Sequence, residues 1–119
     1  MGQVTEGVLQ NNGVGKKGRG GANPTVVTDA DNTDLEVKAN TIYDFGDTPI
    51  TELTITSAEK SYQESVIYFV TGGAITFSAP NTIKWGGDGS APSGLELNTR
   101  YCISICNGLA EIDTFGTVS

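Results

Sequence analysis

Apolar and polar residues alternate along most of the chain after residue 35, and turn-forming residues interrupt this pattern about every eight to twelve residues. Leu53 and Ile55 fall on one side of such a segment, whereas Glu52 and Thr54 fall on the other. Successive side chains of a β-strand point to opposite faces, so the alternation predicts half-buried strands. No stretch repeats apolar residues at helical spacing, so we expect no long helix.

This pattern predicts an all-β fold, an antiparallel β-sandwich (jelly-roll-like) of about seven or eight short strands. Residues 65–70 are apolar on both faces, which is typical of a central strand or of one covered by a neighbouring subunit. Gly72-Gly73 and Asn107-Gly108 each predict a tight hairpin turn.

The chain divides into an N-terminal arm, residues 1–34, and a β-sandwich domain, residues 35–119. Seven glycines lie within the first 21 residues, and few apolar side chains are present there to offset the entropy lost on ordering. We therefore expect a flexible arm that becomes ordered on a partner. Val26 and Val27 are expected to be apolar anchors that pair with a sheet edge and help to hold the arm on that partner.

Charge is divided unevenly between these two parts of a chain whose net charge is −7. Residues 1–19 hold Lys16, Lys17 and Arg19 with one acid, a net charge of +2, and the remainder carries −9. This division predicts that the three basic residues anchor the arm to an acidic partner surface, and it argues against nucleic-acid binding by the body.

The chain offers little catalytic chemistry. It has no histidine, which removes the commonest general base and transition-metal ligand. A glycosidase needs two carboxylates that face each other across a cleft, and the acids considered for this role are Asp44, Asp47 and Glu52. They occupy alternating solvent-facing positions with no obvious cleft between them. We therefore expect no enzyme and assign no catalytic residue.

Two further motifs fail as ligand sites. The acidic stretch from Asp29 to Asp34 begins like a calcium loop, but Asp34 and Asn40 stand where such a loop needs glycine and a bidentate glutamate. Residues 13–18 lack the spacing of a phosphate-binding loop. We expect no metal and no cofactor.

Cys102 and Cys106 are four residues apart in a strand-like run. A regular strand would separate them by about 13 Å at about 3.3 Å per residue, too far for a disulfide. Free thiols buried as small apolar residues suit folding in a reducing cytoplasm. The chain also lacks an apolar run long enough to cross a membrane, and its first residues lack the apolar segment of a signal peptide.

Trp85, which precedes a glycine-rich stretch containing Asp88, allows two interpretations. An aromatic ring beside such a loop can stack on a sugar or fill a partner's pocket. Alternation also places Trp85 on the same side as Ile83, which predicts a core residue, and we favour this second interpretation.

Several segments together resemble a known module. They are residues 38–46 (KANTIYDFG), 53–55 (LTI), 68–72 (YFVTG), 80–85 (PNTIKW) and 98–109 (NTRYCISICNGL). In this order and spacing, over residues 38–115, they resemble the C-terminal β-domain of structural proteins of tailed bacteriophages, especially those of gut bacteria.

The resemblance implies a virion structural protein that is made in the host bacterial cytoplasm. A capsid decoration protein or head fibre, docked through its arm on a capsid, portal or tail protein, is the expected role. Such modules commonly form trimers, which would cover Val66, Tyr68 and Val70 at a subunit interface. The alternative is a tail-associated adhesion module that binds a receptor or glycan through Trp85 and Asp88.

Overall fold

The computed structural model describes residues 23–29, 31–87 and 89–118, which form an all-β fold without helices. Seven strands make up one mixed sheet. They are β2 (Thr25–Val27), β3 (Asp34–Val37), β4 (Thr41–Ala58), β5 (Ser65–Ser78), β6 (Lys84–Trp85), β7 (Thr99–Cys106) and β8 (Leu109–Thr117).

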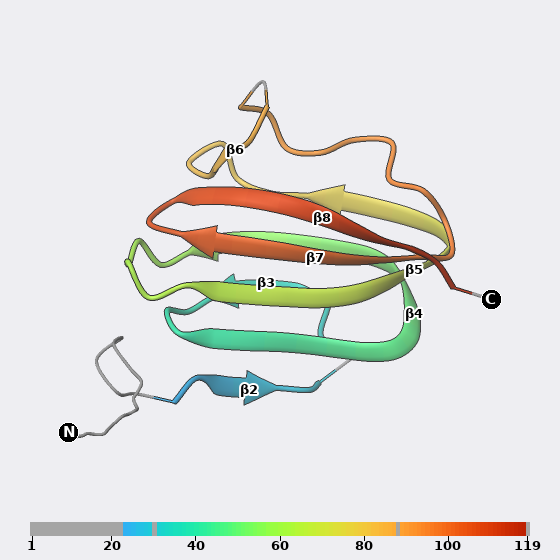
Figure 1. The fold of residues 1–119 in the computed structure, drawn as a ribbon, viewed down its shortest axis with the longest axis horizontal. Helices are drawn as coiled ribbons and strands as arrows, with labels where there is room; N and C mark the ends of the chain where they lie inside the picture. The colour runs from blue at the N-terminus through green and yellow to red at the C-terminus, as the bar shows by residue number, and fades with distance from the viewer. Residues whose placement is uncertain (1–22, 30, 88, 119) are drawn as a thin grey trace, which may run out of the picture.

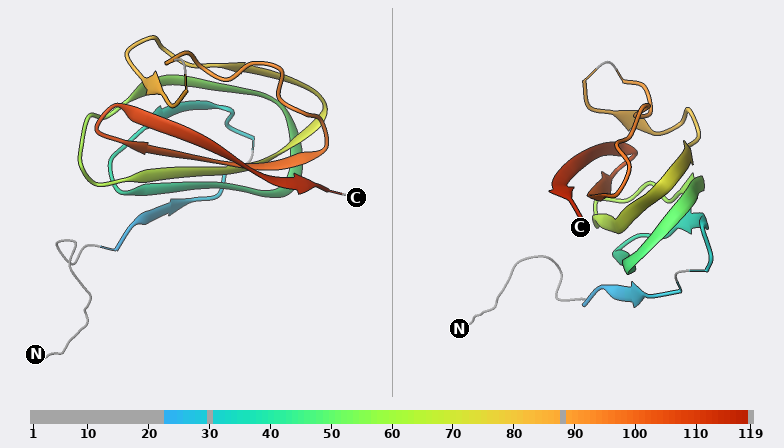
Figure 2. Two further views of the ribbon diagram at one scale, coloured as in Figure 1. Left: turned by 45° about the horizontal axis from the view of Figure 1, so that its top comes forward. Right: turned by 90° about the vertical axis from the view of Figure 1, so that its right-hand side faces the viewer.

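The first half of the sheet is a stack of parallel coils (Figures 1 and 2). β4 is long enough to line two sides of the molecule, and its residues 41–43 pair with β2 while residues 54–58 pair with β3. β5 follows the same course and pairs in parallel with both parts of β4. The pair β2 and β3, then β4, then β5 are therefore three successive turns of the chain around one interior, which we call coils 1 to 3.

Antiparallel pairing completes the sheet. β7 pairs with the first part of β5, β8 pairs with β7, and the short β6 runs parallel to β8 (Figure 1). The β7–β8 hairpin turns at Asn107 and Gly108, whose φ angles are 54° and 78°. Positive φ at both positions is the geometry that Asn-Gly supplies in a two-residue hairpin, so this prediction is confirmed.

The interior consists of rows of apolar side chains that run across the strands. One row continues from Val27 through Tyr43, Ile67 and Ile103 to Ile112, each residue being the register partner of the next. Leu53 and Ile55, predicted to face inward, are buried on the opposite side of the same core. Stacking in register buries one side chain against the next, which is how repeated coils share a core that no single coil could form.

Asn40 ties three levels of the stack together at one corner. Its φ of 54° lies in the left-handed region, where asparagine is tolerated better than most residues. The side-chain amide of Asn40 donates to the main-chain carbonyl of Asn23. The main-chain carbonyl of Asn40 accepts from the N–H of Thr25, and its main-chain N–H donates to the carbonyl of Gln63. These bonds fix the corner at which the chain enters coil 2.

The sheet corrects the expectation of an antiparallel jelly-roll sandwich, because coils 1 to 3 are parallel and the arrangement is that of a short β-solenoid. Gly72-Gly73 makes no hairpin: neither residue has positive φ, and β5 continues through both. A Cβ added at Gly72 would lie 3.3 Å from Thr51 Cγ2. Gly72 therefore does not form a turn. Its lack of a side chain lets β5 lie close to Thr51 of β4.

Two narrower expectations also change. The sheet begins at Thr25, inside the expected arm, because β2 and β3 pair with β4 of the same chain. Cys102 and Cys106 are free thiols, as expected, and Cys102 is buried, but Cys106 is only partly buried. Burial raises the pKa of the Cys102 thiol, and the nearby carboxylates of Asp113 and Glu64 raise it further.

Candidate functional site

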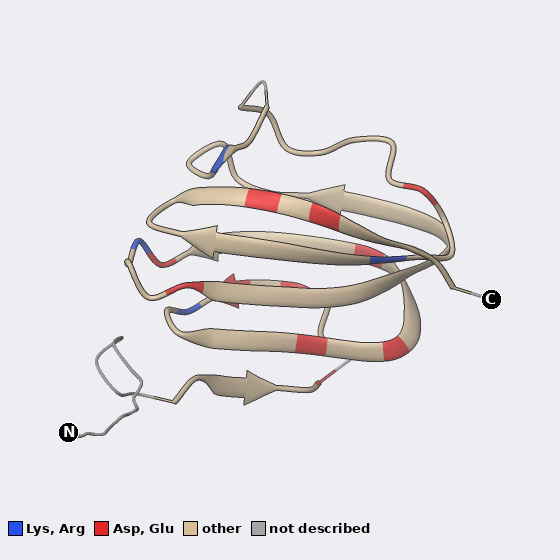
Figure 3. Ribbon diagram, viewed as in Figure 1, with Lys and Arg blue, Asp and Glu red and all other residues tan. Residues whose placement is uncertain are grey.

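Acidic residues outnumber basic ones in the described part of the chain (Figure 3). It contains twelve Asp and Glu residues and four Lys and Arg residues. Five of the acids, Asp29, Asp31, Asp34, Glu36 and Asp44, belong to coil 1 or to the adjoining part of β4. The end of the stack at coil 1 is therefore a strongly acidic surface.

Coil 1 is also an open end of the stack. β2 is the last strand of the sheet order, and β3 pairs only with β4, so the outer edge of each strand has no neighbour among the described residues. In a parallel pair, alternate residues direct both main-chain groups to the partner. Because Thr25 N–H bonds to Asn40 on the β4 side, Val26 directs its N–H and C=O to the free edge. We call the end of the stack formed by the outer edges of β2 and β3 the open end.

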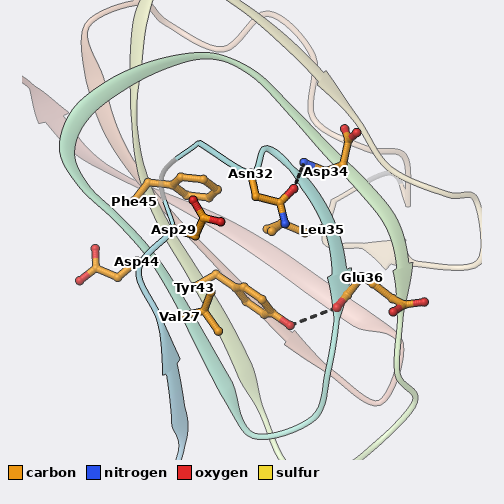
Figure 4. Close-up of a pocket in the computed structure, with 9 residues that line it drawn as sticks. All are labelled: Val27, Asp29, Asn32, Asp34, Leu35, Glu36, Tyr43, Asp44 and Phe45. Atoms are coloured by element: carbon orange, nitrogen blue, oxygen red, sulfur yellow. Dashed lines mark hydrogen bonds between the residues drawn. The ribbon is translucent and has the colours of Figure 1, made fainter.

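The open end contains a cleft of about 180 Å³ between β2, the turn after it and β3 (Figure 4). Its apolar walls come from Val27, Leu35, Tyr43 and Phe45. In Figure 4 the Asp29 carboxylate lies beside the ring of Phe45, whereas the Asp44 carboxylate points away from the cleft. The cleft has room for one long side chain, with a carboxylate at its mouth.

Hydrogen bonds within the turn hold this shape. Asp29 accepts from the N–H of Asp31, and Asn32 accepts from the N–H of Asp34 through its side-chain oxygen. Asx turns of this kind let asparagine and aspartate replace main-chain partners, which explains why polar residues crowd the segment that links β2 to β3.

Tyr43 spans the interior at the base of the cleft. Its hydroxyl donates to the carbonyl of Glu36 at 3.1 Å and accepts from the N–H of Lys38 at 2.8 Å, so it bridges coil 2 to β3 (Figure 4). Its ring is buried in the core row.

Tyr43→Phe should lower the free energy of unfolding by about 1–3 kcal/mol, because it leaves two partly buried main-chain groups without their partner. Urea unfolding followed by Trp85 fluorescence measures this loss. An unchanged midpoint would show that water replaces the hydroxyl at no cost and that Tyr43 does not hold β3 in place.

The outer face of the sheet carries a second feature, a row of Val26, Ile42 and Val66, which are register neighbours on the side opposite the core row. Val26 is 57% exposed, and Ile42 and Val66 are partly exposed. Tyr68, also on this face, is 40% exposed. We call these four residues the outer apolar row.

The structure separates the three residues expected at a subunit interface. Val66 and Tyr68 face outward, but Val70 is buried within its own chain. A register irregularity between Asp44 and Pro49 of β4 lies opposite this part of β5, and Val70 pairs with Pro49 and Arg100 there. The side chain of Val70 is therefore not exposed at the expected interface.

Trp85 is a core residue, as favoured from its alternation with Ile83. It is 6% exposed and meets Phe77 edge to face with ring centroids 5.7 Å apart. Its ring is not available for stacking on a sugar, and Asp88, its expected companion, lies outside the described residues. The indole Nε1 is buried without a hydrogen-bond acceptor among the residues described.

The remaining candidate residues do not assemble into a chemical site. Asp44, Asp47 and Glu52 are exposed, and Asp47 forms an ion pair with Arg100 at 2.8 Å. Within residues 23–29, 31–87 and 89–118, no three Asp, Glu, Cys or His residues are grouped so that they could hold a metal ion. The same residues contain no helix that is long and apolar enough to cross a membrane.

The anchoring residues Lys16, Lys17 and Arg19 lie outside the described residues, whereas Val26 and Val27, expected to anchor the arm on a partner, pair with β4 of the same chain. Sequence reasoning did not find the cleft, because its walls come from three segments that only the coil register brings together. The crowding of acids between Asp29 and Asp34 was the one visible signal. Comparison of the chain with protein-family models, with curated proteins and with solved structures found no match.

Proposed function

We propose that this chain is a non-enzymatic structural protein of a tailed-bacteriophage particle, a capsid decoration or head-fibre protein that associates with copies of itself. The outer apolar row is the observation that carries the proposal. A strand with apolar residues on both faces is expected where both faces are covered, and among the described residues only the core face is.

Self-association would cover the outer apolar row. Val26, Ile42 and Val66 lie on three adjacent strands, so they form one continuous strip. Removing apolar surface from water contributes about 25 cal/mol per Å², and a symmetric assembly repeats the gain at each subunit. A trimer, the state implied by the phage resemblance, would bring three such strips together.

The arm supplies the second contact of this proposal. Lys16, Lys17 and Arg19 precede an acidic body, and they would make salt-sensitive contacts with an acidic surface of a capsid, portal or tail protein. An adhesion module that uses Trp85 is less well supported, since the indole ring is packed against Phe77.

The test measures both assembly and particle incorporation. Light scattering on the purified chain of 12.4 kDa should give the mass of a trimer, and Val66→Asp should reduce it to a monomer that remains folded. Thr82→Asp, a change of the same charge at an exposed loop position, should leave the trimer intact.

The same variants can be followed into virions of the phage that encodes the chain. Wild-type and Thr82→Asp chains should appear in purified particles by mass spectrometry, and Val66→Asp should be depleted. A wild-type chain that is monomeric at every concentration tested would contradict self-association, and its absence from particles would contradict the virion role.

A further inference from the structure

We propose that the outer face of β7 and β8 carries a binding site for an arginine side chain of a partner protein. The site is a cleft of about 480 Å³ beside the β7–β8 turn. The inference does not depend on the proposed virion role, because it rests on residues that belong neither to the outer apolar row nor to the open end.

Strand register brings the floor of this cleft together. Ser104 of β7 pairs with Val66 of β5 and with Glu111 of β8. Val66 belongs to the outer apolar row, so all three side chains lie on the face opposite the core. Two residues along on the same face, Cys106 pairs with Leu109. The outward-facing residues of β7 and β8 therefore form the floor of the cleft.

The loop between β4 and β5 forms one wall. The N–H of Asn107 donates to the carbonyl of Ser61 at 2.7 Å, and the thiol of Cys106 donates to the carbonyl of Tyr62 at 3.5 Å. These bonds hold Tyr62 beside the β7–β8 turn, and the residue is 83% exposed. Leu109, which lines the same cleft, is 62% exposed. The cleft therefore contains an exposed aromatic ring and an exposed aliphatic side chain.

Two carboxylates complete the site. Glu64 and Glu111 line the cleft, both are exposed, and neither forms an ion pair with another described residue. A Cβ added at Gly86 would lie 3.5 Å from Glu111 Cγ, so the Glu111 side chain packs over the main chain that follows β6. Lys84 is the one basic residue that lines the described cleft, and its ammonium group donates to the carbonyl of Asn81 at 3.2 Å. Among the described residues, the two carboxylates thus lack a counter-ion.

The hydrogen-bonding character of the cleft selects the ligand. Ionised carboxylates only accept hydrogen bonds, and a guanidinium group only donates them, through five N–H groups. Strand spacing places the Cα atoms of Glu64 and Glu111 about 12 Å apart, so both side chains can approach one guanidinium group between them. The guanidinium group also stacks on aromatic rings, and its aliphatic stem lies along apolar surface. A neutral sugar would instead bring hydroxyl acceptors that carboxylates cannot satisfy.

The arginine is assigned to another protein because of the arginines in this chain. Arg100, the one arginine among the described residues, is already paired with Asp47 at 2.8 Å. The chain's other arginine, Arg19, lies outside the described residues, and the experiment below tests it separately.

Nuclear magnetic resonance titration of the full chain with acetyl-arginine amide tests the site. The main-chain amide signals of Gly86, Ser104 and Glu111 should shift and saturate, whereas the signals of coil 1 should not move. Acetyl-citrulline amide has nearly the same shape without the charge. It should bind about tenfold more weakly, because hydrogen bonds between charged groups are the stronger ones.

Substitutions at the exposed lining residues assign the contacts. Glu64→Gln and Glu111→Gln should each weaken binding about fivefold, as expected for the loss of an exposed ion pair. Glu52→Gln, which removes the same charge at an exposed position of β4, should not change the affinity. Tyr62→Ala should weaken binding about threefold and Tyr62→Phe should not, because the ring and not the hydroxyl group meets the cation. The remaining signals of each spectrum show that the variant is folded.

Four results would overturn the proposal. The absence of a saturable shift would show that the cleft does not bind arginine. Equal affinities for the arginine and citrulline compounds would show that charge does not select the ligand. Glucose that shifts the same signals at a lower concentration would assign the cleft to a sugar. A higher affinity in Arg19→Gln would show that an arginine of this chain competes for the cleft, and not one from another protein.

Discussion

Phe69→Ala should lower the free energy of unfolding by about 3–5 kcal/mol, one of the two largest losses that we expect from a single substitution in this chain. Phe69 is 1% exposed at the centre of β5, and its ring stacks on Tyr101 with centroids 5.7 Å apart. β5 contacts β4 on one side and β7 on the other, so the residue lies where the parallel coils meet the antiparallel hairpin. Removing the ring leaves a cavity at this junction.

Tyr68→Ala is the matched control, because it deletes the neighbouring aromatic ring on the outer face. Tyr68 is partly exposed, so its removal should cost about 1 kcal/mol or less in the monomer. Urea unfolding at protein concentrations where the chain is monomeric measures both values. Equal losses would show that β5 does not place Phe69 inward and Tyr68 outward, and the register of coil 3 would then be wrong.

Trp85→Ala should destabilise the fold by a similar amount, about 3–5 kcal/mol, because the indole fills space against Phe77 and the rest of the core. Trp85→Phe should cost far less, about 1 kcal/mol. The phenylalanine retains most of the apolar contact and loses no hydrogen bond, since the indole N–H has no acceptor among the described residues.

The pair of Trp85 variants also separates a core residue from a recognition residue. A core role predicts that stability falls from wild type through Trp85→Phe to Trp85→Ala, as measured by thermal unfolding followed by far-ultraviolet circular dichroism. If Trp85→Ala leaves the midpoint unchanged and abolishes binding to cells or glycans, the packing argument fails and the adhesion alternative gains its binding residue.

Local patterns predicted those features that depend on near neighbours in the sequence. Leu53, Ile55, Ile83 and Trp85 are buried as their alternation predicted. The Asn107-Gly108 turn was predictable because two positive φ angles favour these two residue types over most others. In contrast, the sequence Gly72-Gly73 does not distinguish a turn from a close contact between strands, since glycine favours both.

Local sequence patterns were enough to predict that the chain is all-β, that Leu53, Ile55, Ile83 and Trp85 face the core, where one hairpin turns, and that basic residues precede an acidic body. Only the tertiary structure decided that the strands stack in parallel coils, that Val70 is buried and that acids surround an open end. The reason is physical: a period of two is the same in parallel and antiparallel strands, so it cannot distinguish them. Which strands pair depends on contacts between residues far apart in the chain, such as Ile42 with Val66 and Leu35 with Ile55, and these form only when the coils close around a shared core.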